Sequence, residues 1–159
     1  MHRSIWYHVY MEHIHKRHNV SLLIYHLVCP AKFRREIFSE GVSNTLKKTC
    51  LELGLRYEID FLEIGTDNDH VHFLIQTIPN RSVSNTVKLI KSITAREIYK
   101  QNPEVKRFLW GGNIWTMGYY INTVGQYGDI KMIQNYVKNQ GIPNYTQLHS
   151  QQVSLFDTL

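Results

Sequence analysis

The fold is decided by the stretch YEIDFLEIGTDNDHVHFLIQTI, residues 57–78. Its two ends are rich in apolar and β-branched residues, and the polar segment GTDND between them is typical of a turn that joins two strands. We therefore predict an antiparallel hairpin. Because successive side chains of a strand point to opposite faces, His70 and His72 share one face, whereas Val71 and Phe73 point to the other, into the core.

The segments around this hairpin complete one α+β domain. Apolar residues at strand and helix spacings predict strands over residues 20–28 and 115–124, and helices over residues 32–54, 84–101 and 130–140. The order is then βαββαβ followed by a helix. This order predicts a ferredoxin-like antiparallel sheet with helices on one face, plus a C-terminal helix.

Local signals set the limits of these elements. Pro30 is expected to end the ladder of the first strand, since it cannot donate a backbone hydrogen bond. Gly54 is placed as the end of the first helix, because glycine accepts the left-handed conformation that often closes a helix. Ser82 or Ser84 can cap the second helix through its hydroxyl. The chain is expected to divide into an N-terminal arm, a catalytic domain and a polar tail over residues 1–18, 19–143 and 144–159.

The composition is that of a basic globular protein. Eighteen Lys and Arg against thirteen Asp and Glu give a net charge of +5, which suits a polyanionic partner such as nucleic acid, although many basic proteins bind none. Cys29 and Cys50 are too few for a disulfide framework and are predicted to be reduced thiols. Because no apolar run reaches the roughly 18 residues that span a bilayer, we expect a cytoplasmic protein without a membrane segment.

Two histidines on one rigid strand face form half of a metal site. His70 and His72 have this arrangement, although two ordinary histidines would have the same spacing. The N-terminal arm holds a second copy of the spacing, His13 and His15, with neither an acidic loop before it nor an apolar strand after it. We assign that copy no catalytic role, and the spacing alone is therefore weak support for a site.

The last predicted helix can add two more groups. Tyr136 and Gln140 are four residues apart, so they project from the same side of a helix, one turn apart. They can reach one site together. A tyrosine in a chain that contains ten is more often a packing residue, and the spacing does not decide between the two roles.

Five segments, in this order, carry a resemblance to a known family: YHLVCPAKFRR, TDNDHVHFLIQ, VKLIKSITAR, LWGGNIWTMGYYINTVG and IQNYVKNQ. Over about residues 20–141 the chain resembles the single-tyrosine HUH transposases of bacterial and archaeal insertion sequences, the IS200/IS605 group. Two departures are modest: Val28 stands where the family usually has tryptophan, and Ala31 intervenes before Lys32.

The resemblance implies a specific activity. The family motif of histidine, bulky apolar residue and histidine falls on His70-Val71-His72, its nucleophile on Tyr136 and its glutamine ligand on Gln140. It implies a single-strand DNA transposase that recognises hairpins at element ends, and that cleaves and rejoins DNA through a 5′-phosphotyrosine. It also implies a homodimer in which the tyrosine helix of one subunit completes the histidine pair of the other; the spacing leaves assembly in cis or in trans open.

The resemblance also implies a divalent metal, bound by His70, His72 and Gln140. Two imidazoles and an amide oxygen suit Mn²⁺ at least as well as Mg²⁺, so we expect Mg²⁺ in the cell and Mn²⁺ as a substitute. Asp69 can orient an imidazole from outside the ligand set, although an acidic turn would look the same. Basic residues that can contact phosphates, or simply form a solvated face, are Lys32, Arg34, Arg35, Lys88, Lys91 and Arg96.

Aromatic residues before and within the fourth strand, Trp110, Trp115, Tyr119 and Tyr120, can stack on bases, but core packing is the more common role. Three other functions stay open. A domesticated relative that nicks palindromic repeats would look almost identical. A replication-type relaxase usually has a third histidine ligand, against which Gln140 argues. A non-catalytic nucleic-acid-binding module would leave the four matched positions unexplained.

Overall fold

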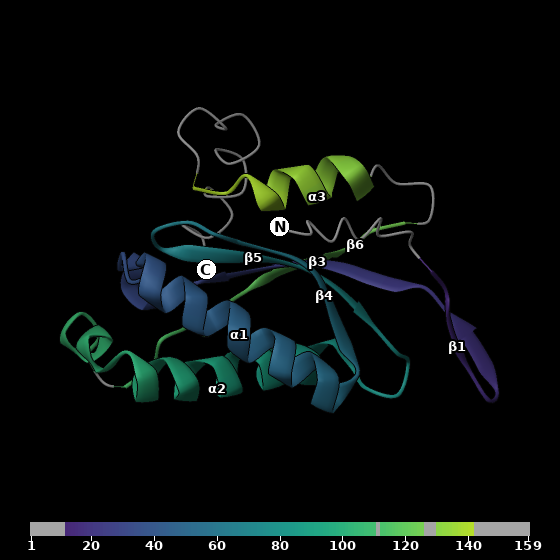
Figure 1. Ribbon diagram of the computed structural model, residues 1–159, viewed down its shortest axis with the longest axis horizontal. Helices are drawn as coiled ribbons and strands as arrows, with labels where there is room; N and C mark the ends of the chain where they lie inside the picture. Colours follow the sequence, from purple (N-terminus) through teal and green to yellow (C-terminus); the bar gives the residue numbers. More distant parts are fainter. Residues whose placement is uncertain (1–11, 111, 126–129, 142–159) are drawn as a thin grey trace, which may run out of the picture.

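Four antiparallel strands form the centre of the molecule (Figure 1). The structure, a computed structural model, describes residues 12–110, 112–125 and 130–141. The predicted tail of residues 144–159 and most of the predicted arm therefore lie outside the described residues. The sheet contains β3 (Leu23–Pro30), β4 (Ile59–Thr66), β5 (His70–Thr77) and β6 (Tyr120–Thr123).

The strand order is β4-β5-β3-β6, with every neighbouring pair antiparallel. The predicted hairpin is confirmed as β4 and β5, whose register runs from Ile59 opposite Thr77 to Thr66 opposite Val71. β3 pairs with β5 along its whole length and places Val28 opposite His72. This order and the βαββαβ succession confirm the predicted ferredoxin-like fold.

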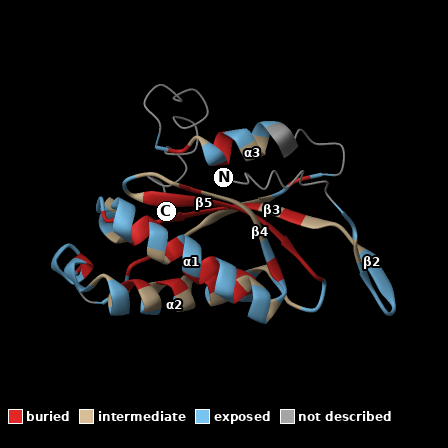
Figure 2. Ribbon diagram, in the orientation of Figure 1, coloured by how far each residue is buried: buried red, intermediate tan, exposed pale blue. Residues whose placement is uncertain are grey.

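Helices cover the two faces of the sheet unequally (Figure 1). α1 (Glu40–Tyr57) and α2 (Val83–Gln101) lie on one face, and α3 (Ile130–Lys138) lies on the other. Every residue of β5 is buried, as the red central strand in Figure 2 shows. None of the helices among the described residues has the length and apolar content needed to cross a membrane.

The two faces of β5 serve different layers. Val71 and Phe73 point into the main core, where they pack with residues of α1 and α2, as predicted. Leu74 points the other way, into a smaller apolar cluster with Ile24 and Ile133 beneath α3. Strand alternation then places His70 and His72 on the α3 side with Leu74. A single strand thus supplies both the core and the side chains under α3.

The first helix differs from its prediction at both ends. Residues Lys32–Arg34 form a separate 3₁₀ turn, η1, and α1 begins only after Ser39, whose hydroxyl accepts a hydrogen bond from the Val42 amide. The helix also runs through Gly54 and ends at Tyr57. The prediction that Gly54 ends the helix is therefore wrong. Glycine is needed there for packing, because a Cβ would lie 2.5 Å from the carbonyl oxygen of Ile59. Glycine lets the end of α1 lie against the first residue of β4.

The N-terminal end of β3 also differs from its prediction. The apolar run from residue 20 does not form one strand, because Asn19–Ser21 (β2) pairs with Ile14–Lys16 (β1) in a separate two-stranded hairpin, and β3 starts at Leu23. The prediction that no strand frames His13 and His15 is therefore wrong. Both of these histidines are exposed, however, and their hairpin is not part of the four-stranded sheet.

The remaining elements agree more closely with the sequence. α2 begins at Val83, and its cap is Ser82, which accepts a hydrogen bond from the Asn85 amide at 3.2 Å. A second 3₁₀ turn, η2 (Pro103–Arg107), follows it. β6 is shorter than predicted, because the residues before it make only an isolated bridge between Trp115 and Ala31.

Gly65 in β4 is where the backbone of α3 meets the sheet. A Cβ on Gly65 would lie 1.7 Å from the carbonyl oxygen of Val137 and 3.0 Å from Cβ of Gln140. Such distances are far inside van der Waals contact, so only glycine allows α3 to lie as it does. The position of α3 over the sheet therefore depends on the absence of a side chain at residue 65.

We predict that Gly65→Ala lowers the free energy of unfolding by about 1–3 kcal/mol, because α3 must move away from β4. Urea denaturation measures this loss, and amide hydrogen exchange in α3 should rise with it. Gly41→Ala is the matched control, since the nearest atom to its Cβ would be Nδ2 of Asn102 at 3.7 Å. Alanine favours a helix by up to about 1 kcal/mol over glycine, so Gly41→Ala should not destabilise. Equal stability of the two variants would contradict the close approach at Gly65.

Candidate active site

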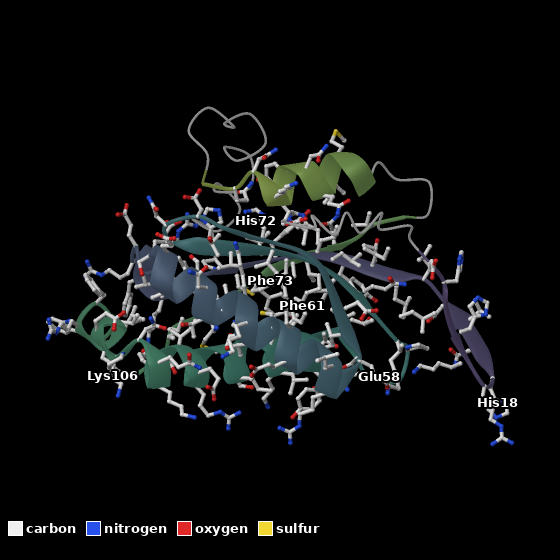
Figure 3. The ribbon with its side chains drawn as sticks, in the orientation of Figure 1. His18, Glu58, Phe61, His72, Phe73 and Lys106 are labelled. Atoms are coloured by element: carbon white, nitrogen blue, oxygen red, sulfur yellow. The ribbon has the colours of Figure 1, made fainter. Side chains whose placement is uncertain are left out.

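The four residues singled out from the sequence come together between the sheet and α3. His70 and His72 extend from β5 toward α3, which carries Tyr136, and Gln140 follows just beyond its end. The ring centroids of His70 and His72 are 5.0 Å apart, and those of His72 and Tyr136 are 5.3 Å apart. All four side chains are buried. Figure 3 labels His72 in this layer, beneath α3.

Gln140 reaches the site from a turn and not from the helix proper. α3 ends at Lys138, and the Gln140 amide donates to the Val137 carbonyl at 3.3 Å. Its Nε2 donates to the carbonyl of Tyr136 at 3.1 Å, whereas Oε1 is buried with no hydrogen-bond partner among the described residues. A buried amide oxygen without a donor is costly, and a cation would satisfy it. Gln140 thus lies one turn beyond Tyr136, as predicted, but in the turn that follows α3 and not in the helix itself.

His70 is held by a carboxylate that is itself held by an arginine. Nδ1 of His70 lies 2.6 Å from Oδ1 of Asp69, and Nε of Arg34 donates to Oδ2 of Asp69 at 2.7 Å. Burial would raise the pKa of Asp69, but the hydrogen bonds from His70 and Arg34 outweigh it and lower the pKa to about 2. Asp69 is therefore an anion at neutral pH and can fix the orientation of the His70 ring.

The backbone that carries Arg34 is unusual. Phe33 and Arg34 both have positive φ angles, 58° and 52°, which side-chain-bearing residues rarely adopt. The Ala31 amide also donates to the Asp69 carbonyl at 2.8 Å, so the segment after β3 is bound to the loop before β5. Two strained residues are thus maintained where they bring a guanidinium to Asp69.

A third histidine in the site was missed by the sequence reasoning. His26 of β3 is buried, and its Nε2 lies 2.9 Å from Nδ1 of His72. Its ring stacks on His72 at 5.2 Å between centroids and meets the Tyr136 ring edge-on at 6.1 Å. Burial lowers the pKa of His26 to about 4, so it is neutral at neutral pH. The available signal was one histidine in the middle of an otherwise apolar central strand.

The ligands available for a metal are limited. Among the described residues, no three His, Cys, Asp or Glu side chains are grouped in a way that could hold a metal ion. A metal at His70 and His72 therefore needs another kind of donor, and the amide oxygen of Gln140 is buried in the same layer. Two imidazoles with one amide oxygen form a donor set that suits a divalent first-row metal.

Comparison with known proteins decides the family. The model of the family described as "Transposase IS200 like" matches residues 19–140. The chain belongs to the IS200-like transposase family. Its members are HUH tyrosine transposases, enzymes of DNA transposition.

Individual relatives support this assignment. The ISDra2 transposase TnpA of Deinococcus radiodurans is 31% identical over 118 residues, which cover 74% of this transposase and 84% of the relative. The transposase for insertion sequence element IS200 of Salmonella typhimurium is 32% identical over 120 residues, which cover 73% and 75%.

Solved structures show the same fold. A crystal structure of a protein from Deinococcus radiodurans assigned as a transposase matches with a TM-score of 0.65 and 28% identity, over 80% of this transposase and 98% of that chain. A REP-associated tyrosine transposase bound to a REP hairpin matches with a TM-score of 0.55 at 11% identity, over 78% and 69%. The second likeness concerns the fold alone.

The basic side chains predicted to contact phosphates separate into two groups in this transposase. Lys32, Arg34 and Arg35 follow β3, beside the loop that carries Asp69. Those of the second group belong to α2, on the face of the sheet opposite α3: Lys88, Lys91 and Arg96. Only the first group lies next to the histidines.

The aromatic side chains also divide. Trp115 is buried, stacks on Phe38 and donates from Nε1 to the hydroxyl of Thr94 at 3.1 Å, so it belongs to the core. Tyr119 and Tyr120 are half-buried, whereas Trp110 is 83% exposed. Trp110 is the member of the predicted set that is open to a base.

Lys91 has a local structural function. Its Nζ donates to the carbonyls of Thr116, Met117 and Gly118 at 2.6, 3.2 and 3.4 Å, and so ties α2 to the segment before β6. We predict that Lys91→Met lowers the free energy of unfolding by about 1–3 kcal/mol, because these carbonyls lose a charged donor. Lys88→Met, an exposed position on the same helix, should stay within about 0.5 kcal/mol of the original.

Chemical denaturation measures both stabilities, and single-strand DNA binding at several salt concentrations provides a second readout. A lysine that contacts phosphate changes the salt dependence by nearly one counterion when removed. We expect Lys91→Met to leave that slope unchanged. An unchanged stability together with a reduced slope would show that Lys91 acts on DNA.

Proposed function

We propose that this transposase cleaves and rejoins single-stranded DNA at the ends of an insertion sequence, with Tyr136 as nucleophile. The observation that carries the proposal is the contact between Tyr136 and His72, whose ring centroids lie 5.3 Å apart in the layer that also holds His70 and Gln140. A nucleophile and candidate metal ligands in one buried layer suit covalent attack on a phosphodiester.

The proposed ligands of a divalent metal are His70, His72 and Gln140. Nδ1 of each histidine is engaged, by Asp69 in one case and by His26 in the other, so a metal would be bound through Nε2 of both rings. The buried Oε1 of Gln140 fits the third position. When bound, Mg²⁺ or Mn²⁺ would polarise the scissile phosphate and neutralise its charge. Mg²⁺ is the metal we propose in the cell, with Mn²⁺ as a substitute.

The covalent step belongs to Tyr136. Its hydroxyl oxygen attacks phosphorus, a bond to that phosphorus forms, and the bond from phosphorus to the 3′ oxygen breaks. The phenolic proton is released, and the leaving 3′ oxygen takes up a proton. The products are a 5′-phosphotyrosine and a free 3′-OH, so a second 3′-OH can reverse the step and join strands without ATP.

Access to Tyr136 requires a movement. Its side chain is 3% exposed, so a DNA phosphate can approach only after α3 shifts from the sheet. Exchange of α3 between the subunits of a homodimer, which the resemblance implies, is compatible with such a shift and remains part of the proposal.

The proposed partner is a single-stranded DNA hairpin at the element end. Family membership supports it, and a protein of the same fold is bound to a REP hairpin in its solved structure. Lys32 and Arg35 are the proposed phosphate contacts nearest the histidines, since they continue from β3 beside the Asp69 loop. Such contacts contribute salt-dependent affinity and little sequence preference.

Tyr136→Phe should reduce covalent attachment to a single-stranded hairpin oligonucleotide by at least about 1,000-fold, since loss of the nucleophile abolishes nearly all of the covalent reaction. The substrate comes from the protein's own locus and is labelled at its 3′ end, because the fragment retained on the tyrosine carries that label. Denaturing gel electrophoresis measures the labelled protein. DNA binding should remain largely intact.

Tyr120→Phe is the matched control for the nucleophile. Tyr120 is half-buried and meets His26 edge-on at 6.3 Å, so it is a second tyrosine within reach of the same layer. This variant should form the adduct normally. An adduct trapped with Tyr136→Phe, or one lost only with Tyr120→Phe, would refute Tyr136 as the nucleophile.

The double variant His70→Ala, His72→Ala should lose metal-dependent cleavage, because both imidazole ligands are gone. The chain provides its own control in the second His-Ile-His copy: the double variant His13→Ala, His15→Ala removes two exposed histidines of the same spacing. Cleavage of the hairpin is measured with and without Mg²⁺. Full activity of the first double variant would exclude the proposed metal site.

A further inference from the structure

His26 lies at the centre of the contacts in the site, although the family motif on β5 does not include it. It belongs to β3 and shares a face with Ile24, which packs in the apolar cluster beneath α3. Its ring contacts His72 and Tyr136 at once, a metal-ligand candidate and the proposed nucleophile.

The hydrogen bond between His26 and His72 has a direction once a metal is considered. A neutral imidazole that binds metal through Nε2 carries its proton on Nδ1. Nδ1 of His72 must then donate to Nε2 of His26, 2.9 Å away, and His26 must be the acceptor. A neutral His26 ring that carries its proton on Nδ1 leaves Nε2 able to accept this hydrogen bond.

We propose that His26 is a positioning residue of the metal site: it holds His72 in the tautomer that presents Nε2 to a metal, and it supports the ring of Tyr136. The proposal rests on the proposed metal assignment and goes beyond it, since it gives His72 a partner of its own. His70 is oriented by Asp69 with Arg34. Each ligand histidine is then fixed by a different strand or loop.

Packing alone would leave this arrangement unexplained. A histidine that only fills space between β3 and α3 needs no particular nitrogen near His72, and an apolar residue would fill that space without a buried polar ring. The near-parallel stacking of the two rings, at 20° between planes, occurs together with a hydrogen bond between their nitrogens. The contact therefore restrains both the position and the tautomer of His72.

The test compares two amide variants that differ only in reach. His26→Gln places its amide at about the position of Nε2 and can still accept from His72. His26→Asn places its amide at about the position of Nδ1 and cannot. Binding of Mn²⁺ to the DNA-free protein is measured by the electron paramagnetic resonance signal of the free ion. We expect His26→Gln to bind within about threefold of the original protein, and His26→Asn to bind about 10–100-fold more weakly.

Ile24→Ala is the packing control, because Ile24 is buried on the same strand face, two residues away. It should lower stability while leaving Mn²⁺ affinity within about threefold. Equal Mn²⁺ affinity of His26→Asn and the original protein would overturn the proposal. So would equal losses in the Gln and Asn variants, or a loss in Ile24→Ala as large as that in His26→Asn.

A measurement on the original protein covers the case in which His26→Asn does not fold. Nitrogen chemical shifts of ¹⁵N-labelled histidines report which ring nitrogen carries the proton. We expect His72 to be protonated on Nδ1 and His26 to be unprotonated on Nε2 before any metal is added. Protonation of His72 on Nε2 instead would overturn the positioning role. Absence of Mn²⁺ binding in the original protein would overturn the metal assignment itself, a result distinct from either.

Discussion

The pairing of β3 with β5 is the interaction on which the rest of the structure depends. The two strands run antiparallel over eight residues, from Leu23 opposite Thr77 to Pro30 opposite His70. Both lie inside the sheet, so each has a neighbouring strand on either side. This pairing sets the register that brings His26 against His72, and a slip of one strand by one residue would turn its histidine into the opposite layer and separate the two rings.

The layer under α3 combines polar side chains with close packing. Histidine, tyrosine and glutamine side chains are buried there, and an apolar cluster around Leu74 lies beside them. Buried polar groups are costly unless they have partners. In this layer the costs are offset by specific contacts, namely Asp69 with His70, His26 with His72, and the amide of Gln140 with the Tyr136 carbonyl.

Backbone features around the same layer position the side chains of the proposed site. The strain at Phe33 and Arg34 is maintained by backbone hydrogen bonds between the segment after β3 and the loop before β5. The absence of a side chain at Gly65 lets α3 approach the sheet. α3 is a short helix next to β4, the strand at the edge of the sheet, and it carries the proposed nucleophile. The sheet therefore holds the two histidines proposed as ligands, while the proposed nucleophile lies on a separate helix.

The sequence by itself determined the hairpin of β4 and β5 and the βαββαβ order, because side-chain periodicity is a local property. The proposal of His70, His72, Tyr136 and Gln140 as site residues came from ordered motifs that resemble those of a known family. The sequence did not determine where α1 begins, since the 3₁₀ turn and the strained residues before it depend on contacts with the Asp69 loop. Nor did it identify the role of Gly54, which depends on the distant carbonyl of Ile59.

Only the tertiary structure decided which polar residues share the site. His26 and His72 are 46 positions apart in the chain, and their contact arises from strand register. Arg34, a predicted phosphate contact, binds Asp69 in the folded chain, and Lys91 donates to three backbone carbonyls. A basic side chain has the same appearance in sequence whether its partner is a phosphate, a carboxylate or a carbonyl. The partner is chosen by what the folded chain places within hydrogen-bonding distance.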